Sequence, residues 1–209
     1  MAQKQNIVVS LFEVESEAFQ AMTELRQDPG NEKSFLSSAA LVKNENGKFR
    51  TLDAFDTGAQ TTDDTEIGGL VGALFGVLGG PIGVLLCSSY GALLGSAFDA
   101  GDALMEVSMF EQIAKKSMDG DIAIIGLVYE EDETVLDEKL GKFKATIARF
   151  DAATVAAEVE EAEKMEEELA RQARQQLRDA KKAEFREKIA AGKEKLAADW
   201  EALKANITE

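Results

Sequence analysis

The sequence predicts an α+β fold: an antiparallel sheet with helices, an inserted apolar helical hairpin and a long C-terminal helix. Three observations support this expectation. Short apolar runs at strand and helix spacing alternate along the first 150 residues. The stretch from Ile67 to Phe98 has no charged residue and is rich in glycine. From Asp151 onward there is no proline and a single glycine, and Ala, Glu, Lys, Arg and Gln dominate, as is typical of a long helix.

The chain opens with a predicted strand and helix. In residues 7–12, both the odd-numbered and the even-numbered positions carry apolar side chains. A strand here would be apolar on both faces, which indicates that it is buried on both. Ser16 is the expected N-cap of a helix with apolar residues at helical spacing, and Pro29-Gly30 is expected to end it.

A hairpin and a further helix and strand follow. Strands are predicted at 37–43 and 48–55, and Asn46-Gly47 between them favours a tight turn because both residues tolerate positive φ. After the glycine-rich run, apolar residues at helical spacing predict a helix over 104–114, and residues 122–129 form an apolar strand.

The order strand, helix, strand, strand, helix, strand is the ferredoxin-like pattern, an antiparallel sheet with helices on one face. A short helix at 134–140, capped by Gly141, and a strand at 145–150 complete this part. We therefore expect a ferredoxin-like domain over 1–151, with residues 66–100 inserted in it as a helical hairpin.

The inserted run carries a predicted glycine zipper that turns at Gly79-Gly80-Pro81. Residues four apart share one face of a helix, so these glycines leave a groove of bare backbone that another helix can approach closely. The bulky residues on the other faces must be covered by protein or by lipid. The residues expected to form this packing surface are Gly68, Gly72, Gly76, Gly80, Gly83, Gly91, Gly95, Leu74, Phe75, Leu85 and Phe98.

Two features favour protein over lipid as the partner of this hairpin. A first helix from Glu66 to Leu78 would be about 20 Å long, well short of the roughly 30 Å hydrocarbon core of a bilayer. The flanks, with Asp63, Asp64 and Asp99, are acidic, whereas cytoplasmic flanks of spanning helices usually carry Lys or Arg. We therefore expect homo-oligomers bundled through the hairpin, with insertion into a lipid bilayer as the alternative.

The segment 152–209 is predicted to be a charged helical arm of one or two helices, about 85 Å long if fully helical. Glutamates dominate from Glu158 to Glu168, and Lys and Arg dominate from Arg171 to Lys188. This order suits the helix dipole and makes the arm complementary to a second copy, antiparallel or staggered. A solvated helix that lies on its own domain or a neighbouring one is the other interpretation.

Composition excludes most catalytic chemistry. The net charge is −16 and the sequence pI is near 4.5, so nucleic-acid binding is unlikely. There is no histidine and Cys87 is the only cysteine, which excludes catalytic triads, disulfides within the chain and the common zinc sites. The acidic clusters, which are Asp53 with Asp56, Asp63 with Asp64, and residues 130–133, lack calcium-loop spacing and are expected to be solvated loops. We predict no enzyme activity, catalytic residue, cofactor or metal. The beginning of the chain is too acidic for a signal peptide, so the predicted location is cytoplasmic, with membrane association as the alternative.

The glycine-rich run between an Asn-Gly hairpin and an amphipathic helix resembles a bacterial family of unknown function labelled predicted membrane proteins. The matching parts are Asn6–Phe12, the turn at Asn46-Gly47, Gly68–Gly95 and Ile122–Tyr129. The resemblance implies no chemistry and transfers no catalytic residue. The long charged arm departs from that pattern and favours assembly into a ring, cage or filament.

Overall fold

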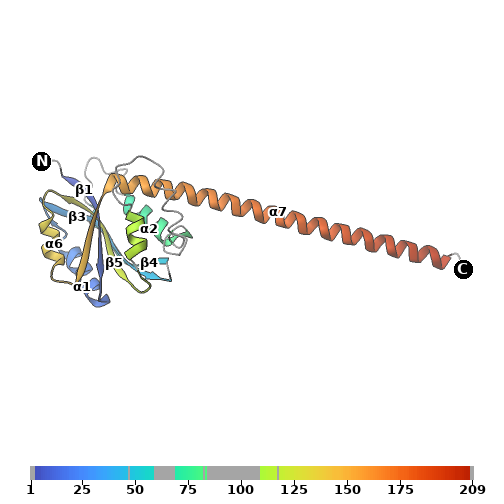
Figure 1. Cartoon of the computed structure of the whole chain (residues 1–209), viewed down its shortest axis with the longest axis horizontal. Coiled ribbons are helices and arrows are strands. Elements are labelled where there is room, and N and C mark those ends of the chain that lie inside the picture. Colours follow the sequence, from blue (N-terminus) through green and yellow to red (C-terminus); the bar gives the residue numbers. More distant parts are fainter. Residues whose placement is uncertain are drawn as a thin grey trace. The chain divides into compact units, whose positions relative to one another are not determined.

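The computed structural model describes residues 3–46, 48–58, 69–81, 83, 109–116 and 118–207 (Figure 1). The chain divides into two units, Met1–Glu163 and Lys164–Glu209. The first unit is built on a six-stranded antiparallel sheet with helices, and α7 is a long C-terminal helix, so the predicted mixed fold with an antiparallel sheet is confirmed.

The bounds agree with the sequence prediction to within a few residues for most elements. The elements are β1 (Lys4–Phe12), α1 (Glu15–Gln27), β2 (Gly30–Asn31), β3 (Ser34–Glu45), β4 (Lys48–Asp56), α2 (Leu70–Gly79), α5 (Met109–Lys116), β5 (Ile122–Glu130), α6 (Thr134–Leu140), β6 (Ala145–Asp151) and α7 (Ala152–Ile207).

Two local predictions have clear outcomes. The hairpin between β3 and β4 is confirmed, because Glu45 pairs with Lys48 and Asn46 has a φ of 57°. The N-cap at Ser16 is wrong. The N-cap is Val14, two residues earlier, so helix α1 begins at Glu15, and Val14 offers no side-chain hydrogen bond. Glu15 and Glu17 in the first turn interact favourably with the helix dipole there.

The most apolar strand lies inside the sheet and the most polar long strand lies at its edge. The strand order is β2-β3-β5-β1-β6, and β4 pairs with β3 beside β2. All nine residues of β5 are buried, whereas five of the nine in β4 are exposed. Because a central strand has neighbours on both edges and layers on both faces, the nearly continuous apolar sequence of β5 suits that place.

Helices α1 and α6 cover one face of the sheet (Figure 1). Val8 and Phe12 of β1 point to this face and share a core with Met22 of α1 and Leu140 of α6. The rings of Phe12 and Phe143 meet edge to face, with centroids 6.3 Å apart. This face therefore holds a closed apolar core.

Helix α2 covers part of the opposite face. Alternation along β1 directs Ile7 and Val9 to this side, and both are buried. Phe49 shares the side, and its carbonyl oxygen lies 3.4 Å from where a Cβ on Gly79 of α2 would be. The expectation of helices on one face is thus wrong, because β1 and β5 are apolar on both sides and each side needs a cover.

Helix α7 is one helix of 56 residues. Its first turns belong with the sheet unit, because Ala152, Val155, Val159 and Ala162 are buried at helical spacing. Glu158 accepts hydrogen bonds from the amides of Met109 and Phe110 in α5, at 3.3 and 3.5 Å. The sheet unit thus extends twelve residues beyond the domain boundary predicted at residue 151.

Candidate functional site

One side of α2 contributes to the core of the sheet unit. Its buried residues are Leu70, Val71, Leu74, Val77 and Leu78. Leu74, which was expected to pack against another copy or lipid, has no exposed surface in the single chain. The bulky side of this helix is therefore covered by the chain itself and lies against β3, β4 and β5.

The other side of α2 is bare backbone. Gly72 and Gly76 are four residues apart and exposed, and a Cβ added to either would meet no described atom within 4 Å. Gly69, just before the helix, is equally open. Glycine in a helix interior costs about 0.5–1 kcal/mol relative to Ala. No described neighbour lies so close to Gly72 or Gly76 that it would exclude alanine there. We call residues 69, 72 and 76 the glycine face.

The residues that follow α2 use glycine for a different reason. The helix ends at Gly79, and Gly80 just after it is extended with φ −88° and ψ −174°. A Cβ on Gly83 would overlap the carbonyl group of Leu78. Gly83 is buried and permits a backbone contact that no larger residue allows.

The structure brings together only part of the predicted packing surface. Phe75 lies half-buried on α2, between its two sides. Five further members lie outside the described residues: Gly68, Gly91, Gly95, Leu85 and Phe98. In the part of the chain that can be described, no helix has the length and apolar character needed to cross a membrane.

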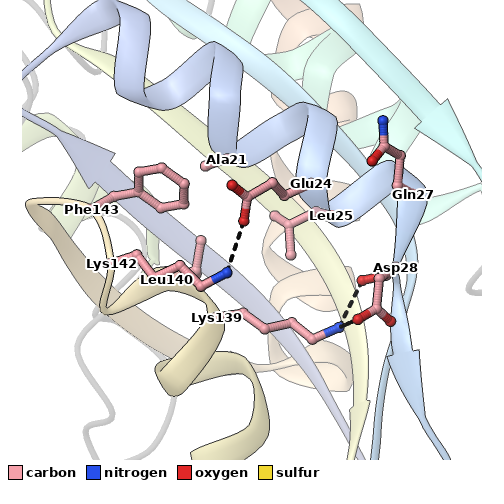
Figure 2. Close-up of a pocket in the computed structure, with 9 residues that line it drawn as sticks. All are labelled: Ala21, Glu24, Leu25, Gln27, Asp28, Lys139, Leu140, Lys142 and Phe143. Carbon is pink, nitrogen blue, oxygen red and sulfur yellow. Dashed lines mark hydrogen bonds and ion pairs between the residues drawn. The ribbon is translucent and has the colours of Figure 1, made fainter.

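A hollow of about 180 Å³ lies between α1 and the end of α6 (Figure 2). Its apolar wall is formed by Ala21, Leu25, Leu140 and Phe143. At its rim, the Lys142 ammonium lies 3.0 Å from Glu24 and the Lys139 ammonium lies 2.7 Å from Asp28.

These ion pairs join the two helices and shift two acid groups. The hydrogen bond from Lys142, with a smaller contribution from Gln20, lowers the pKa of Glu24. The hydrogen bond from Lys139 likewise lowers the pKa of Asp28. Each lysine at the rim pairs with a carboxylate of the other segment. We therefore interpret the hollow as part of the packing contact between α1 and α6.

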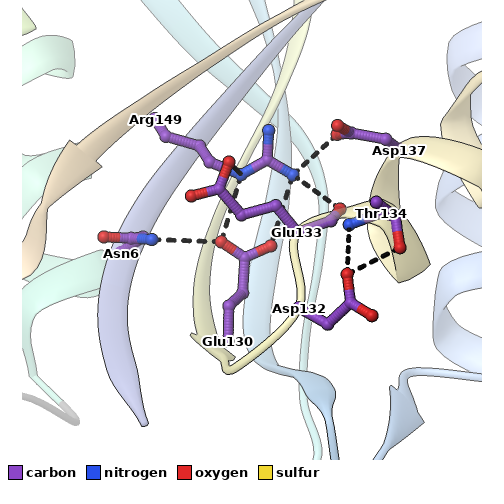
Figure 3. Close-up of polar contacts among 7 residues, drawn as sticks. All are labelled: Asn6, Glu130, Asp132, Glu133, Thr134, Asp137 and Arg149. Carbon is purple, nitrogen blue, oxygen red and sulfur yellow. Dashed lines mark hydrogen bonds and ion pairs between the residues drawn. The ribbon is translucent and has the colours of Figure 1, made fainter.

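A buried carboxylate is held between β1, β5 and β6 (Figure 3). Glu130 is 2% exposed and accepts hydrogen bonds from Asn6 at 3.0 Å and from Arg149 at 3.1 and 3.3 Å. Arg149 also donates to Asp137 of α6 at 2.6 Å and to the Glu133 carbonyl at 3.1 Å. The network ties the edge strand β6 to α6.

Burial by itself would lower the pKa of Arg149, but the hydrogen bonds to Glu130 and Asp137 outweigh it and raise that pKa. The sequence prediction read residues 130–133 as a solvated loop, which is wrong for Glu130. The sequence could have indicated that Glu130 is buried, because this residue directly follows the apolar run Ile122–Tyr129. The partner Arg149 could not be inferred, because strand pairing brings it close from 19 residues away.

Both polar clusters consist of side chains that satisfy one another. Each buried side-chain nitrogen and oxygen in the described residues has a hydrogen-bond partner. No group of three or more Cys, Asp or Glu that could hold a metal ion occurs in the described ranges. The two clusters join secondary-structure elements, and the glycine face remains the feature that the described chain does not explain by itself.

Comparison with protein-family models, with curated proteins and with solved structures finds no match to this chain. The resemblance to the bacterial family labelled predicted membrane proteins accordingly stays a prediction from sequence pattern. Function must be argued from the residues.

Proposed function

We propose that this protein is a non-enzymatic structural protein that self-associates into a homo-oligomer through the glycine face of α2. The observation that carries the proposal is the pair of exposed helical glycines, Gly72 and Gly76, because a Cβ added to either would meet no atom of the described residues within 4 Å. A helix that keeps two glycines at exposed positions loses about 1–2 kcal/mol relative to alanine. Close contact with another helix offsets that loss, since bare backbone allows unusually near approach.

A ferredoxin-like frame is the second part of the proposal. The order β3-β5-β1-β6, antiparallel throughout, supports it, as does the shared core of α1 and α6. In this interpretation the two strand-helix-strand halves are β1-α1-β3 and β5-α6-β6, and the segment from β4 to α5 is the insertion. The sequence prediction had instead placed 48–55 and 104–114 in the frame, which is wrong, because β4 pairs with β3 at the edge of the sheet and β5 lies between β3 and β1. The glycine face would then be presented by an insertion on the sheet face opposite α1 and α6.

Two other partners could cover the glycine face: the chain's own segment 84–108 and a lipid bilayer. Lipid is less well supported, because the ten residues of α2 extend only about 15 Å and their bulky side is already buried. An experiment must therefore separate contact within the chain, contact between copies and contact with lipid.

The test replaces glycine by leucine on the glycine face and measures the mass of the particle by light scattering over a range of concentrations. Gly72→Leu and Gly76→Leu should each lower the mass of the particle at a given concentration while its circular dichroism stays unchanged. Gly192→Leu is the matched control, because Gly192 is also an exposed helical glycine, and a Cβ added to it would meet no described atom within 4 Å. It should keep the wild-type mass.

Three outcomes contradict this proposal. A monomeric wild-type protein removes self-association. Loss of stability in Gly72→Leu at unchanged mass assigns the glycine face to a contact within the chain. Co-flotation of the wild type with phosphatidylcholine vesicles, lost in Gly72→Leu, assigns it to lipid.

A further inference from the structure

Helix α7 carries two oppositely charged segments. The acidic segment, residues 161–168, has five glutamates and one lysine, a net charge of −4. The basic segment, residues 171–188, has seven Lys or Arg and three Asp or Glu, a net charge of +4. We propose that the acidic segment of one copy binds the basic segment of a second copy, with the two helices antiparallel. This extends the proposed self-association by a second contact.

Most charges in these segments are not used within the chain. Two ion pairs join residues four apart, Arg171 to Glu167 at 3.1 Å and Lys188 to Glu184 at 2.7 Å. Such exposed pairs stabilise a helix by about 0.3–0.5 kcal/mol each. Within the described part of the chain, the residues that make no ion pair are Arg174, Arg178, Lys181, Lys182 and Arg186 on the basic side and Glu161, Glu163, Glu166 and Glu168 on the acidic side.

Apolar side chains accompany these charges. Leu177 is 63% exposed and Phe185 is 65% exposed, and Leu169 and Ile189 are also exposed. A helix that is polar on nearly all sides gains little from its own propensity, so large apolar residues on its surface favour a partner that covers them. The partner's charge must match both segments, which a second copy does.

Charge order decides the orientation. Parallel helices in register would place glutamates beside glutamates and arginines beside arginines, which is destabilising. An antiparallel pair places each acidic segment beside the partner's basic segment, so both contacts form in a closed two-fold dimer. A staggered parallel pair forms only one of the two contacts in a dimer.

The test is complementation between two full-length variants. Glu166→Lys with Glu167→Lys and Glu168→Lys makes both segments basic, and Arg174→Glu with Arg178→Glu and Lys181→Glu makes both acidic. Each variant alone should dimerise through the arm at least about tenfold more weakly, a loss of roughly 1.4 kcal/mol. An equimolar mixture should recover wild-type affinity. The pairing should weaken when salt is raised from about 0.05 to 1 M, because screening shortens the range of charge interactions.

Three controls keep the result interpretable. Glu13→Lys with Glu32→Lys and Glu131→Lys makes the same change of net charge at exposed sites of the sheet unit and should leave association unchanged. Performing the mixture in the Gly72→Leu background isolates the arm contact, so its outcome does not depend on the glycine face. Circular dichroism checks that the helix is retained.

Orientation is read by cross-linking in a Cys87→Ser background with a short bis-maleimide. Ala173→Cys, near the midpoint of the two segments, should link to itself, whereas Ile189→Cys should not. Equal linking at both positions overturns the antiparallel arrangement. Unchanged association in both charge-reversed variants, or a mixture that stays as weak as its components, overturns the arm contact.

Discussion

The two faces of the sheet are covered in contrasting ways. On one face, α1 and α6 close over an apolar core and are joined at their rim by Glu24–Lys142 and Asp28–Lys139. On the other face, α2 has no charged residue at all, and its outward side is bare backbone at Gly72 and Gly76. The first layer is completed by residues of the described chain, whereas the second is not.

The contrast shows how a glycine can be interpreted once its neighbours are known. A Cβ on Gly126 would lie 2.6 Å from a methyl carbon of Leu36, and one on Gly83 would overlap Leu78, so close packing in the chain accounts for both. Neither explanation applies to Gly72 or Gly76. An exposed helical glycine without a steric reason therefore indicates a contact that the described residues do not supply.

The largest expected effect tests the buried side of α2. Leu74→Ala should lower the free energy of unfolding by about 2–5 kcal/mol, because it removes a fully buried side chain and leaves a cavity. Urea unfolding measures this. Leu177→Ala, at an exposed position of α7, should change the same quantity by less than about 0.5 kcal/mol. Equal effects would show that α2 does not belong to the core.

The next largest effect compares Gly83, where an added Cβ would overlap the backbone, with Gly76, where it would meet no described atom. Gly83→Ala should lower the free energy of unfolding by about 1–3 kcal/mol, because the added methyl group overlaps backbone atoms of Leu78. The comparison is the free energy of unfolding of Gly76→Ala, measured by the same denaturation. If both substitutions change the free energy of unfolding in the same direction, the two glycines do not differ in the way proposed.

A smaller effect of opposite sign is expected on the glycine face. Gly72→Ala and Gly76→Ala should each raise the free energy of unfolding of the monomer by about 0.5–1 kcal/mol, because alanine favours the helix and meets no described atom. The same variants should weaken self-association. Thermal unfolding at low protein concentration, followed by light scattering at high concentration, measures the two quantities separately.

The smallest expected effect is a loss of stability at low pH, where protonation of Glu24 and Asp28 removes the ion pairs between the α1 and α6 segments. The folded-state pKa values of Glu24 and Asp28 lie below their ordinary values of 4.5 and 3.8. Their stabilisation is therefore present above those ordinary values and is lost as the pH falls through the lowered folded-state values.

Urea midpoints between pH 7 and about 3 measure this loss. Lys142→Met combined with Lys139→Met should make the acid dependence weaker, and Lys33→Met together with Lys144→Met is a control with the same change of charge. An unchanged acid dependence in the first variant would mean that these ion pairs contribute nothing to the layer.

Sequence reasoning succeeded where the signal is local. The turn at Asn46, with its positive φ, and the end of α2 at Gly79, just before Gly80-Pro81, were both predicted from residues with a special backbone preference. It failed where distant segments meet. The Arg149–Glu130 contact depends on both strands pairing with β1, and the cover over the second sheet face depends on where α2 folds back.

The candidate site was predicted in part. The four-residue spacing places Gly72 and Gly76 together, as expected of one helix face. Spacing could not tell that Leu74 would be buried by the chain's own sheet, because hydrophobic periodicity identifies an apolar side but not the surface that covers it.

Local properties of the chain account for most of its strands and helices, for the charge-free run with its glycine spacing, and for the separation of acidic and basic residues in α7. Hydrophobic period, turn residues and charge can all be read along the sequence. Three features required the three-dimensional arrangement: the place of β5 between β3 and β1, the burial of Glu130 against Arg149, and the contrast between the covered Leu74 and a glycine face that meets no described atom. Burial depends on which residues distant in sequence come into contact, and no local pattern specifies that.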